Sequence, residues 1–420
     1  MTPLRLVLVN VFIRIGSAAS GQLFAFLLAD RMASRAGAGS LVAAAIGLAF
    51  YATELVGAPI AGHIADTHGQ RRVLRWGPWF GIGSMLLGAA AALRVTSVTV
   101  LIGILLAARF AEGLSAACAV PTSLVLLSQA TDGDAARSVR LRLMGLFEIA
   151  SLGGIIVGYL LAGTLWDAIG GNTFLMLPLV YLAALVFTGG TDRSVPTPRR
   201  RAKTWTALRY LVQEQGARGF AMAWLAVNAV VGVWLQQAPY LLKLPVRSST
   251  QSLVGGFEAR TIGIVFAVWG MTFLVGIALW SWLAPRWPRR RTLFVALGGM
   301  LGVVVSLAMV NHGGPWWILA LAAIAVIVES GFTPAAFAHL ADLTDAHAES
   351  RGGAMGLYSL LLGLGQLMGA GLGAPFAARW QMDGVLAVTA VLAAVALVGV
   401  RRMSSGPLSP SAQTSGAGGR

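Results

Sequence analysis

The stretch GHIADTHGQRR, residues 62–72, separates two apolar runs, residues 40–64 and residues 73–93. Each run is long enough to cross a bilayer as a helix, because about 20 apolar residues span the hydrocarbon. Gly62 and Asp66 are four residues apart, so they share one face of the helix that the first run predicts. Bilayer hydrocarbon offers an aspartate no partner, and Asp66 must therefore be hydrated or paired where this helix ends.

Gly69, Arg71 and Arg72 complete the stretch. Gly69 lacks a Cβ and permits the positive φ of a turn, and the two arginines follow where lipid phosphates would lie. The pattern G-x-x-x-D-x-x-G-x-R-R resembles the loop between the second and third helices of the major facilitator superfamily. It follows the second of many apolar runs, as the resemblance requires. The alternative is an ordinary basic membrane loop.

The composition of the chain fits only a polytopic membrane protein. Of its 420 residues, 57% are hydrophobic and 11% are charged, whereas soluble domains carry about 25% charged residues. The net charge of +15 lies in short loops between apolar runs, so anionic lipid headgroups rather than nucleic acid are expected as its partner. Cys118 is the one cysteine, and the five histidines lack metal-ligand spacing. We therefore expect no disulfide, no bound metal and no cofactor.

The order of apolar runs predicts an all-α membrane protein with twelve transmembrane helices in two six-helix pseudo-repeats. The N-terminal bundle comprises residues 1–189, and the C-terminal bundle comprises residues 218–402. Between them, residues 190–217 are basic and contain proline, which predicts a cytoplasmic linker. Residues 403–420 are rich in Ser, Gly and Pro, which predicts a disordered cytoplasmic tail. The predicted spans are residues 5–29, 40–64, 73–93, 98–128, 141–165, 172–189, 218–242, 260–284, 292–310, 316–340, 352–376 and 384–400.

Basic residues are unequally distributed between the two sets of loops, and this bias predicts orientation. Most of the Lys and Arg fall on one side when both termini are placed in the cytoplasm. We therefore expect a multi-pass protein of the bacterial inner membrane with both termini cytoplasmic. We expect it to be a monomer.

Six ionisable residues interrupt the apolar runs, although a charge near the bilayer centre costs about 2.5–3.5 kcal/mol on insertion scales. Such residues are expected to face the interior of the bundle and to line a water-filled path. The six are Arg14, Glu54, Arg109, Glu112, Glu148 and Glu329.

Arg109 and Glu112 are three residues apart on one helical face. Their segment, RFAEGLSAA, resembles the R-x-x-x-G segment in the fourth helix of the superfamily, whose arginine is tied to proton transfer or substrate binding. The same role is implied for Arg109, and a structural ion pair with Glu112 is the alternative. The fifth run lacks the proline and one glycine of the antiporter segment G-x-x-x-G-P-x-x-G-G. This departure disfavours a drug/proton antiporter.

The resemblance also implies a central cavity lined by the first, fourth, seventh and tenth helices. The seventh run carries the polar residues Asn228, Gln236 and Gln237, and Asn228 has two interpretations, a substrate ligand or a bridge between helices. Glu329 and Glu54 have no cation in their own helices, so we expect them, Glu329 first, to carry a coupling proton. For Glu329 the alternative is an ion pair with an arginine across the cavity. The family places around the cavity Arg14, Arg109, Glu112, Asn228 and Glu329.

These features predict a secondary transporter, not an enzyme, that moves a small molecule by alternating access. We expect coupling to protons and slightly favour export. Uptake of a metabolite or organic anion, and lipid flipping, are the alternatives. The chain has no P-loop, which disfavours ATP as the energy source. Asp66 is expected to lock the cytoplasmic side when the cavity opens outward.

Overall fold

Helices make up nearly all of the protein, and no strand occurs in the part of the chain that the structure describes. Almost all of the predicted linker and tail lies outside the described residues, so both stay predictions. The computed structural model describes residues 2–129, 137–189, 215–345 and 351–403.

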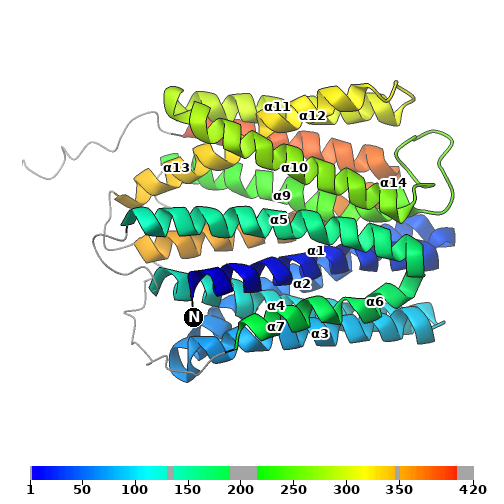
Figure 1. The fold of residues 1–420 in the computed structure, drawn as a ribbon. Helices are drawn as coiled ribbons and strands as arrows, with labels where there is room; N and C mark the ends of the chain where they lie inside the picture. Colours follow the sequence, from blue (N-terminus) through cyan, green and yellow to red (C-terminus); the bar gives the residue numbers. More distant parts are fainter. Residues whose placement is uncertain (1, 130–136, 190–214, 346–350, 404–420) are drawn as a thin grey trace, which may run out of the picture.

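The first half of the chain forms a bundle of helices that run side by side (Figure 1). Pro3 opens the first of them, at a position where a missing N–H leaves no helical hydrogen bond unmade. Short 3₁₀ turns at Ala33–Arg35 and Gly170–Asn172 connect neighbouring helices. The helices of this half are α1 (Pro3–Arg31), α2 (Ala36–His68), α3 (Gln70–Arg94), α4 (Val98–Gln129), α5 (Arg137–Ile169), α6 (Thr173–Met176) and α7 (Pro178–Phe187).

The second half forms a similar bundle. Ser330 and Gly331 separate two of its helices, and a further 3₁₀ turn lies at Ala284–Arg286. Gln381, with φ 53° and ψ −125°, interrupts the last helix. The helices of this half are α9 (Gln215–Lys243), α10 (Ala259–Leu283), α11 (Arg289–Asn311), α12 (Ile318–Glu329), α13 (Phe332–Asp345) and α14 (Arg351–Arg402).

Each half begins and ends at the same end of the bundle, here called the near end and seen on the left in Figure 1. Arg5 at the start of α1 donates a hydrogen bond to the carbonyl of Gly189, beyond the end of α7, at 3.5 Å. A Cβ added to Gly219, near the start of α9, would lie 3.0 Å from the carbonyl carbon of Arg402. Each half therefore crosses the membrane an even number of times, as two six-helix repeats require. The opposite end, where α1 and α9 finish, is called the far end.

The structure confirms an all-helical membrane fold, but the twelve predicted runs do not appear as twelve separate helices. Among the described residues, ten helical stretches are long and apolar enough to cross a membrane, and α7 is a shorter apolar helix. One of the ten, Leu360–Arg402, contains the predicted run 384–400 and most of the run 352–376, because the only non-helical residue inside it is Gln381. The predicted run 172–189 divides into α6 and α7 at Pro178, whose ring and missing N–H interrupt helical hydrogen bonding.

Glycines set the closest helix approaches. A Cβ added to Gly369 of α14 would lie 1.9 Å from the carbonyl oxygen of Ala229 in α9. Gly158 of α5 is equally restricted, because its Cβ would lie 2.5 Å from the carbonyl oxygen of Ile15. Such approaches are possible because glycine has no side chain, and small residues allow helices to pack closely in lipid. Gly298 is an exception, since a Cβ there would meet no atom within 4 Å.

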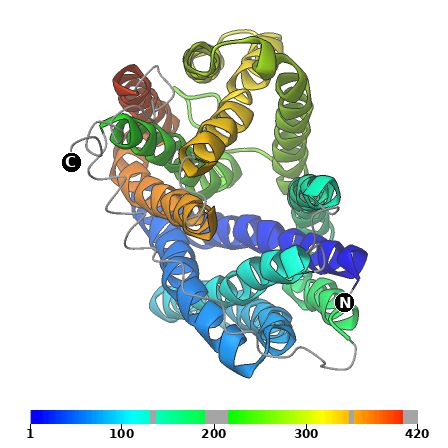
Figure 2. The same ribbon diagram turned by 90° about the vertical axis from the view of Figure 1, so that its left-hand side faces the viewer.

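The two halves meet along two seams on opposite sides of the bundle. Viewed from the near end, α5 lies beside α10 on one side, and α2 lies beside α14 on the other (Figure 2). The first of these seams is packed by Tyr159 and Phe266, whose ring centroids are 5.3 Å apart. Between the seams, α1 contacts α9.

Candidate functional site

A buried cluster of Arg109, Glu112 and Ser20 joins α4 to α1. Arg109 Nη1 lies 2.7 Å from Glu112 Oε2, and the two side chains are 4% and 0% exposed. The Ser20 hydroxyl donates to Glu112 Oε1 and accepts a hydrogen bond from Arg109 Nη1 at 3.3 Å. The predicted pair therefore exists, and its charges compensate each other before any solute binds.

Aromatic rings enclose the guanidinium of Arg109. Its Cζ lies 4.4 Å from the ring centroid of Phe50 in α2 and 5.8 Å from that of Phe24 in α1. A guanidinium over a ring face is attracted by the negative face of the ring. Within the described residues, Arg109 Nε has no hydrogen-bond partner. The cluster is thus rigidly placed but retains one donor.

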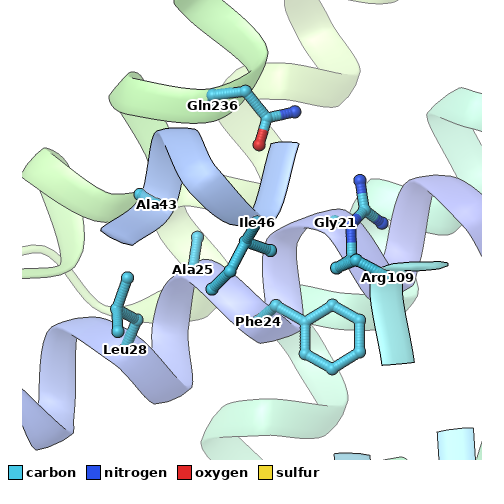
Figure 3. A pocket seen from close by; sticks show the side chains of 8 residues that line it. All are labelled: Gly21, Phe24, Ala25, Leu28, Ala43, Ile46, Arg109 and Gln236. Carbon is cyan, nitrogen blue, oxygen red and sulfur yellow. The ribbon is translucent and has the colours of Figure 1, made fainter. Parts of the chain in front are cut away.

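A small cavity lies beside Arg109, between the two halves of the chain (Figure 3). Its volume is about 10 Å³, roughly the room that a single water molecule needs. Arg109 and the amide of Gln236 reach it from different halves, and the other lining residues are apolar or glycine. Gln236 packs against α2, because a Cβ added to Gly47 would lie 2.4 Å from Gln236 Cδ. This arrangement brings one hydrogen-bonding side chain from each half to the same small cavity.

Two further predicted residues of the first half belong to the same region. Glu54 on α2 lies within electrostatic range of Arg14, Arg109 and Glu112. The side chains of Arg14 and Glu54 are half-buried. Glu148 also lies within electrostatic range of Arg14, but its side chain is exposed. The expectation that it lines a water-filled path stays a prediction.

Asn228 does not join the cluster. Its amide donates to the carbonyl of Trp224 within α9 at 2.9 Å, and its side chain is 8% exposed. A Cβ added to Gly365 of α14 would lie 2.6 Å from Asn228 Cβ. Asn228 therefore occupies the packed contact between α9 and α14, and Gln236 two turns later is the residue of this helix that lines the cavity.

Glu329 ends α12 at the break inside the membrane-spanning stretch Ile318–His339. The break leaves the carbonyl of Ile327 available, and this oxygen accepts hydrogen bonds from Trp280 Nε1 at 2.9 Å and Ser330 Oγ at 2.7 Å. The Trp280 ring covers Gly331, where a Cβ would lie 2.6 Å from its Cδ2. The side chain of Glu329 is half-buried and forms no ion pair or hydrogen bond within the described chain. The alternative pairing with an arginine is absent from this conformation.

The stretch 62–72 forms the turn that its sequence predicts. α2 ends at His68, and Gly69 follows with φ 96° while its N–H donates to the carbonyl of Ala65 at 3.0 Å. Asp66 and Arg72 are exposed, and a Cβ at Gly62 would meet nothing within 4 Å. The Gly62 face of α2 therefore has no close neighbour in this conformation.

Sequence reasoning missed three members of the site, namely Ser20, Phe50 and Gln236. Ser20 and Phe50 carry no charge and repeat no family pattern, so only the fold brings them to Arg109. Gln236 was visible as one of three polar residues in an apolar run, but spacing along one helix does not show which of them faces the other half.

Comparison with known proteins identifies the family. A family model described as the Major Facilitator Superfamily matches residues 6–313 and 253–417. No curated protein matches the chain. A solved D-xylose-proton symporter is similar in fold, with a TM-score of 0.68, 13% identity, and coverage of 96% of this chain and 99% of that chain. The nucleoside transporter NupG is also similar, with a TM-score of 0.63, 14% identity, and coverage of 94% and 98%. The family match extends over nearly the whole sequence, and the chain therefore belongs to the major facilitator superfamily.

Proposed function

We propose that the protein is a secondary active transporter that works by alternating access, and that the structure holds its inward-facing conformation. The observation that carries this proposal is the cavity between the halves, with Arg109 on one wall and Gln236 on the other. A solute held between two bodies is released to one side or the other when the bodies rock.

Polar contacts between the halves at the far end support a closed far side. Gln237, Tyr240 and Lys243 follow one another at three-residue spacing on α9. Gln237 Nε2 donates to the carbonyl of Ser40 at 3.1 Å, and the Tyr240 hydroxyl donates to the carbonyl of Ala36 at 3.0 Å. Lys243 Nζ lies 3.3 Å from Asp30. These contacts hold α9 against the turn between α1 and α2.

Contacts along the two seams continue from the far end to about the middle of the helices. A Cβ on Gly270 would lie 2.9 Å from Ile156, and one on Gly363 would lie 3.3 Å from Leu55. Nearer the other end, Asp66 is exposed and Gly62 has no close neighbour. This asymmetry supports a cavity that opens at the near end.

The near end is assigned to the cytoplasm, because the basic loops of the sequence belong to it. Both termini and the linker of residues 190–217 then lie inside. A single cysteine at Ser194, in a Cys118→Ala background, should react only with reagent that has entered the cell. Reaction with an impermeant maleimide added to intact cells would reverse the assignment.

The site favours a small, uncharged polar solute. Arg109 is already compensated by Glu112 at 2.7 Å, so the cavity presents hydrogen-bonding groups and aromatic faces rather than a net charge. The solved relatives support this class, because one is named as a transporter of D-xylose and another as a transporter of nucleosides. Cationic amphipathic compounds, which would fit export, and organic anions are the competing classes.

Counterflow in proteoliposomes tests the function directly. Vesicles loaded with excess unlabelled sugar, nucleoside, organic cation or organic anion are diluted into the same labelled compound. Transient accumulation of a sugar or nucleoside is the expected result. Accumulation of a charged compound alone would overturn the solute class, and movement of labelled lipid without counterflow of any solute would identify a flippase.

Proton coupling is assigned to Glu329, with Glu54 as second candidate, because Glu329 lies at a helix break without a partner among the described residues. Glu329→Gln should abolish accumulation driven by a pH gradient and leave counterflow intact. Glu258→Gln, which changes an exposed carboxylate just before α10, is the matched control and should leave both unchanged. Retention of gradient-driven accumulation by Glu329→Gln would refute this assignment.

A further inference from the structure

We propose that Asp167 is the positioning residue that holds the far end closed: from α5 in one half it caps the N-terminus of α10 in the other half. The inference rests on the proposed alternating-access function and adds a contact that rocking of the halves must break.

The cap replaces one that α10 does not supply for itself. The residue before this helix, Glu258, makes no side-chain capping hydrogen bond. Instead, the N–H of Ala259 donates to Asp167 Oδ1 at 3.1 Å, and the N–H of Arg260 donates to Asp167 Oδ2 at 2.7 Å. The first N–H groups of a helix have no partner within the helix, and a carboxylate also interacts favourably with the positive end of the helix dipole.

Close backbone approach fixes Asp167 in this position. Gly163 lies one turn before Asp167 on the same face of α5, and a Cβ there would lie 2.3 Å from the carbonyl oxygen of Ala259. On the facing helix, a Cβ at Gly263 would lie 2.5 Å from the carbonyl oxygen of Tyr159. The two glycines bring α5 and α10 together at the far end, so the carboxylate reaches the helix terminus with both oxygens. Any separation of α5 from α10 there removes both hydrogen bonds.

The cap differs from the other polar contact between charged groups at the far end. Lys243 and Asp30 form an ion pair whose side chains are 17% and 40% exposed, and exposed pairs contribute little because water and salt screen them. The Asp167 side chain is exposed as well, but each of its two oxygens accepts a hydrogen bond from a backbone N–H group that otherwise has no helical partner. We therefore assign to Asp167, rather than to Asp30, the larger share of the preference for the closed far end.

Cysteine accessibility tests the assignment without a transport assay. Ser40→Cys, in a Cys118→Ala background, places a thiol at a position that is 0% exposed beside the far-end contacts. The Ser40 contact with Gln237 uses the backbone carbonyl, so this substitution leaves it in place. Leu55→Cys provides the reporter for the near side. Each is labelled in lipid vesicles with an impermeant maleimide applied from the corresponding side.

Asp167→Ala should raise the labelling rate of the Ser40→Cys reporter about five- to tenfold, as expected for loss of a helix cap, and should lower that of the Leu55→Cys reporter. Asp167→Asn keeps one acceptor and should give an intermediate shift even if the alanine variant folds poorly. Asp30→Asn is the control and should change either rate less than about twofold.

Opposite changes at the two reporters distinguish gating from a loss of structure, which would raise both rates together. Equal rates in the wild-type and Asp167→Asn proteins, or a larger effect of Asp30→Asn, would overturn the assignment. Because the readout is conformational, a failure here leaves the counterflow result on the proposed function unaffected. A failure of counterflow likewise leaves the labelling comparison interpretable.

Discussion

Replacement of Glu112 by glutamine separates the structural part of the Arg109 cluster from any role in transport. Glu112 is 0% exposed and accepts hydrogen bonds from Arg109 and Ser20. Removing one partner of a buried ion pair costs about 3–5 kcal/mol, because the remaining charge is left uncompensated. Attraction of the guanidinium to Phe50, at 4.4 Å, is retained and offsets about 1 kcal/mol. The glutamine oxygen still accepts one hydrogen bond, which offsets about another 1 kcal/mol. The expected net loss for Glu112→Gln is therefore about 1–3 kcal/mol.

A double-mutant cycle measured by unfolding of the purified protein checks this value. Arg109→Gln combined with Glu112→Gln leaves no buried charge and should be more stable than the Glu112→Gln single variant. Glu258→Gln, at an exposed position without a capping bond, is the control and should change stability by less than about 0.5 kcal/mol. A loss below about 1 kcal/mol for Glu112→Gln, or a double variant as unstable as the single one, would refute the reasoning. A double variant that is stable but inactive in counterflow would assign the Arg109–Glu112 pair to transport as well.

Three other predictions use different parts of the fold. Gly369→Ala should sharply lower the yield of folded protein in fluorescence-detected chromatography, because its Cβ would lie 1.9 Å from a backbone oxygen of α9. Gly298→Ala, whose Cβ would meet no atom within 4 Å, should leave the yield unchanged. Trp280→Phe removes the indole N–H that donates to the Ile327 carbonyl at 2.9 Å, so it should destabilise the protein by about 1 kcal/mol and lower its Tm. An unchanged Tm would show that the Ser330 hydroxyl alone satisfies the Ile327 carbonyl. If Asp66 closes the near end in the outward-facing state, Asp66→Asn should reduce counterflow and increase near-side labelling of the Leu55→Cys reporter. No change in counterflow or in labelling would reject that role for Asp66.

The membrane fold and the turn at residues 62–72 were predictable from sequence, because both depend on local properties. Run length sets the number of crossings, and Gly69 adopts the positive φ expected from its missing side chain. The count of separate helices was less predictable. Gln381 turns the chain within a single residue, and Ser330 and Gly331 break a helix that hydropathy describes as continuous.

The site was predictable only where its members share a helix. Arg109 and Glu112 are three residues apart, so their pairing followed from helix geometry. Ser20, Phe50 and Gln236 reach the same point from α1, α2 and α9. Contacts between different helices depend on how the helices pack, and this packing cannot be predicted from the spacing of residues in a single sequence. Asp167 was overlooked for the same reason, because its partners are backbone groups 92 and 93 residues away.

The distance between the halves, measured at both ends of one protein, tests alternating access most directly. Spin labels at Thr67 and Arg286 report the near end, and labels at Ser34 and Ser249 report the far end; all four positions are exposed. Addition of a solute identified by counterflow should shorten the near-end distance and lengthen the far-end distance in the same sample. Distances that change in the same direction at both ends, or that stay fixed while counterflow proceeds, would contradict the account.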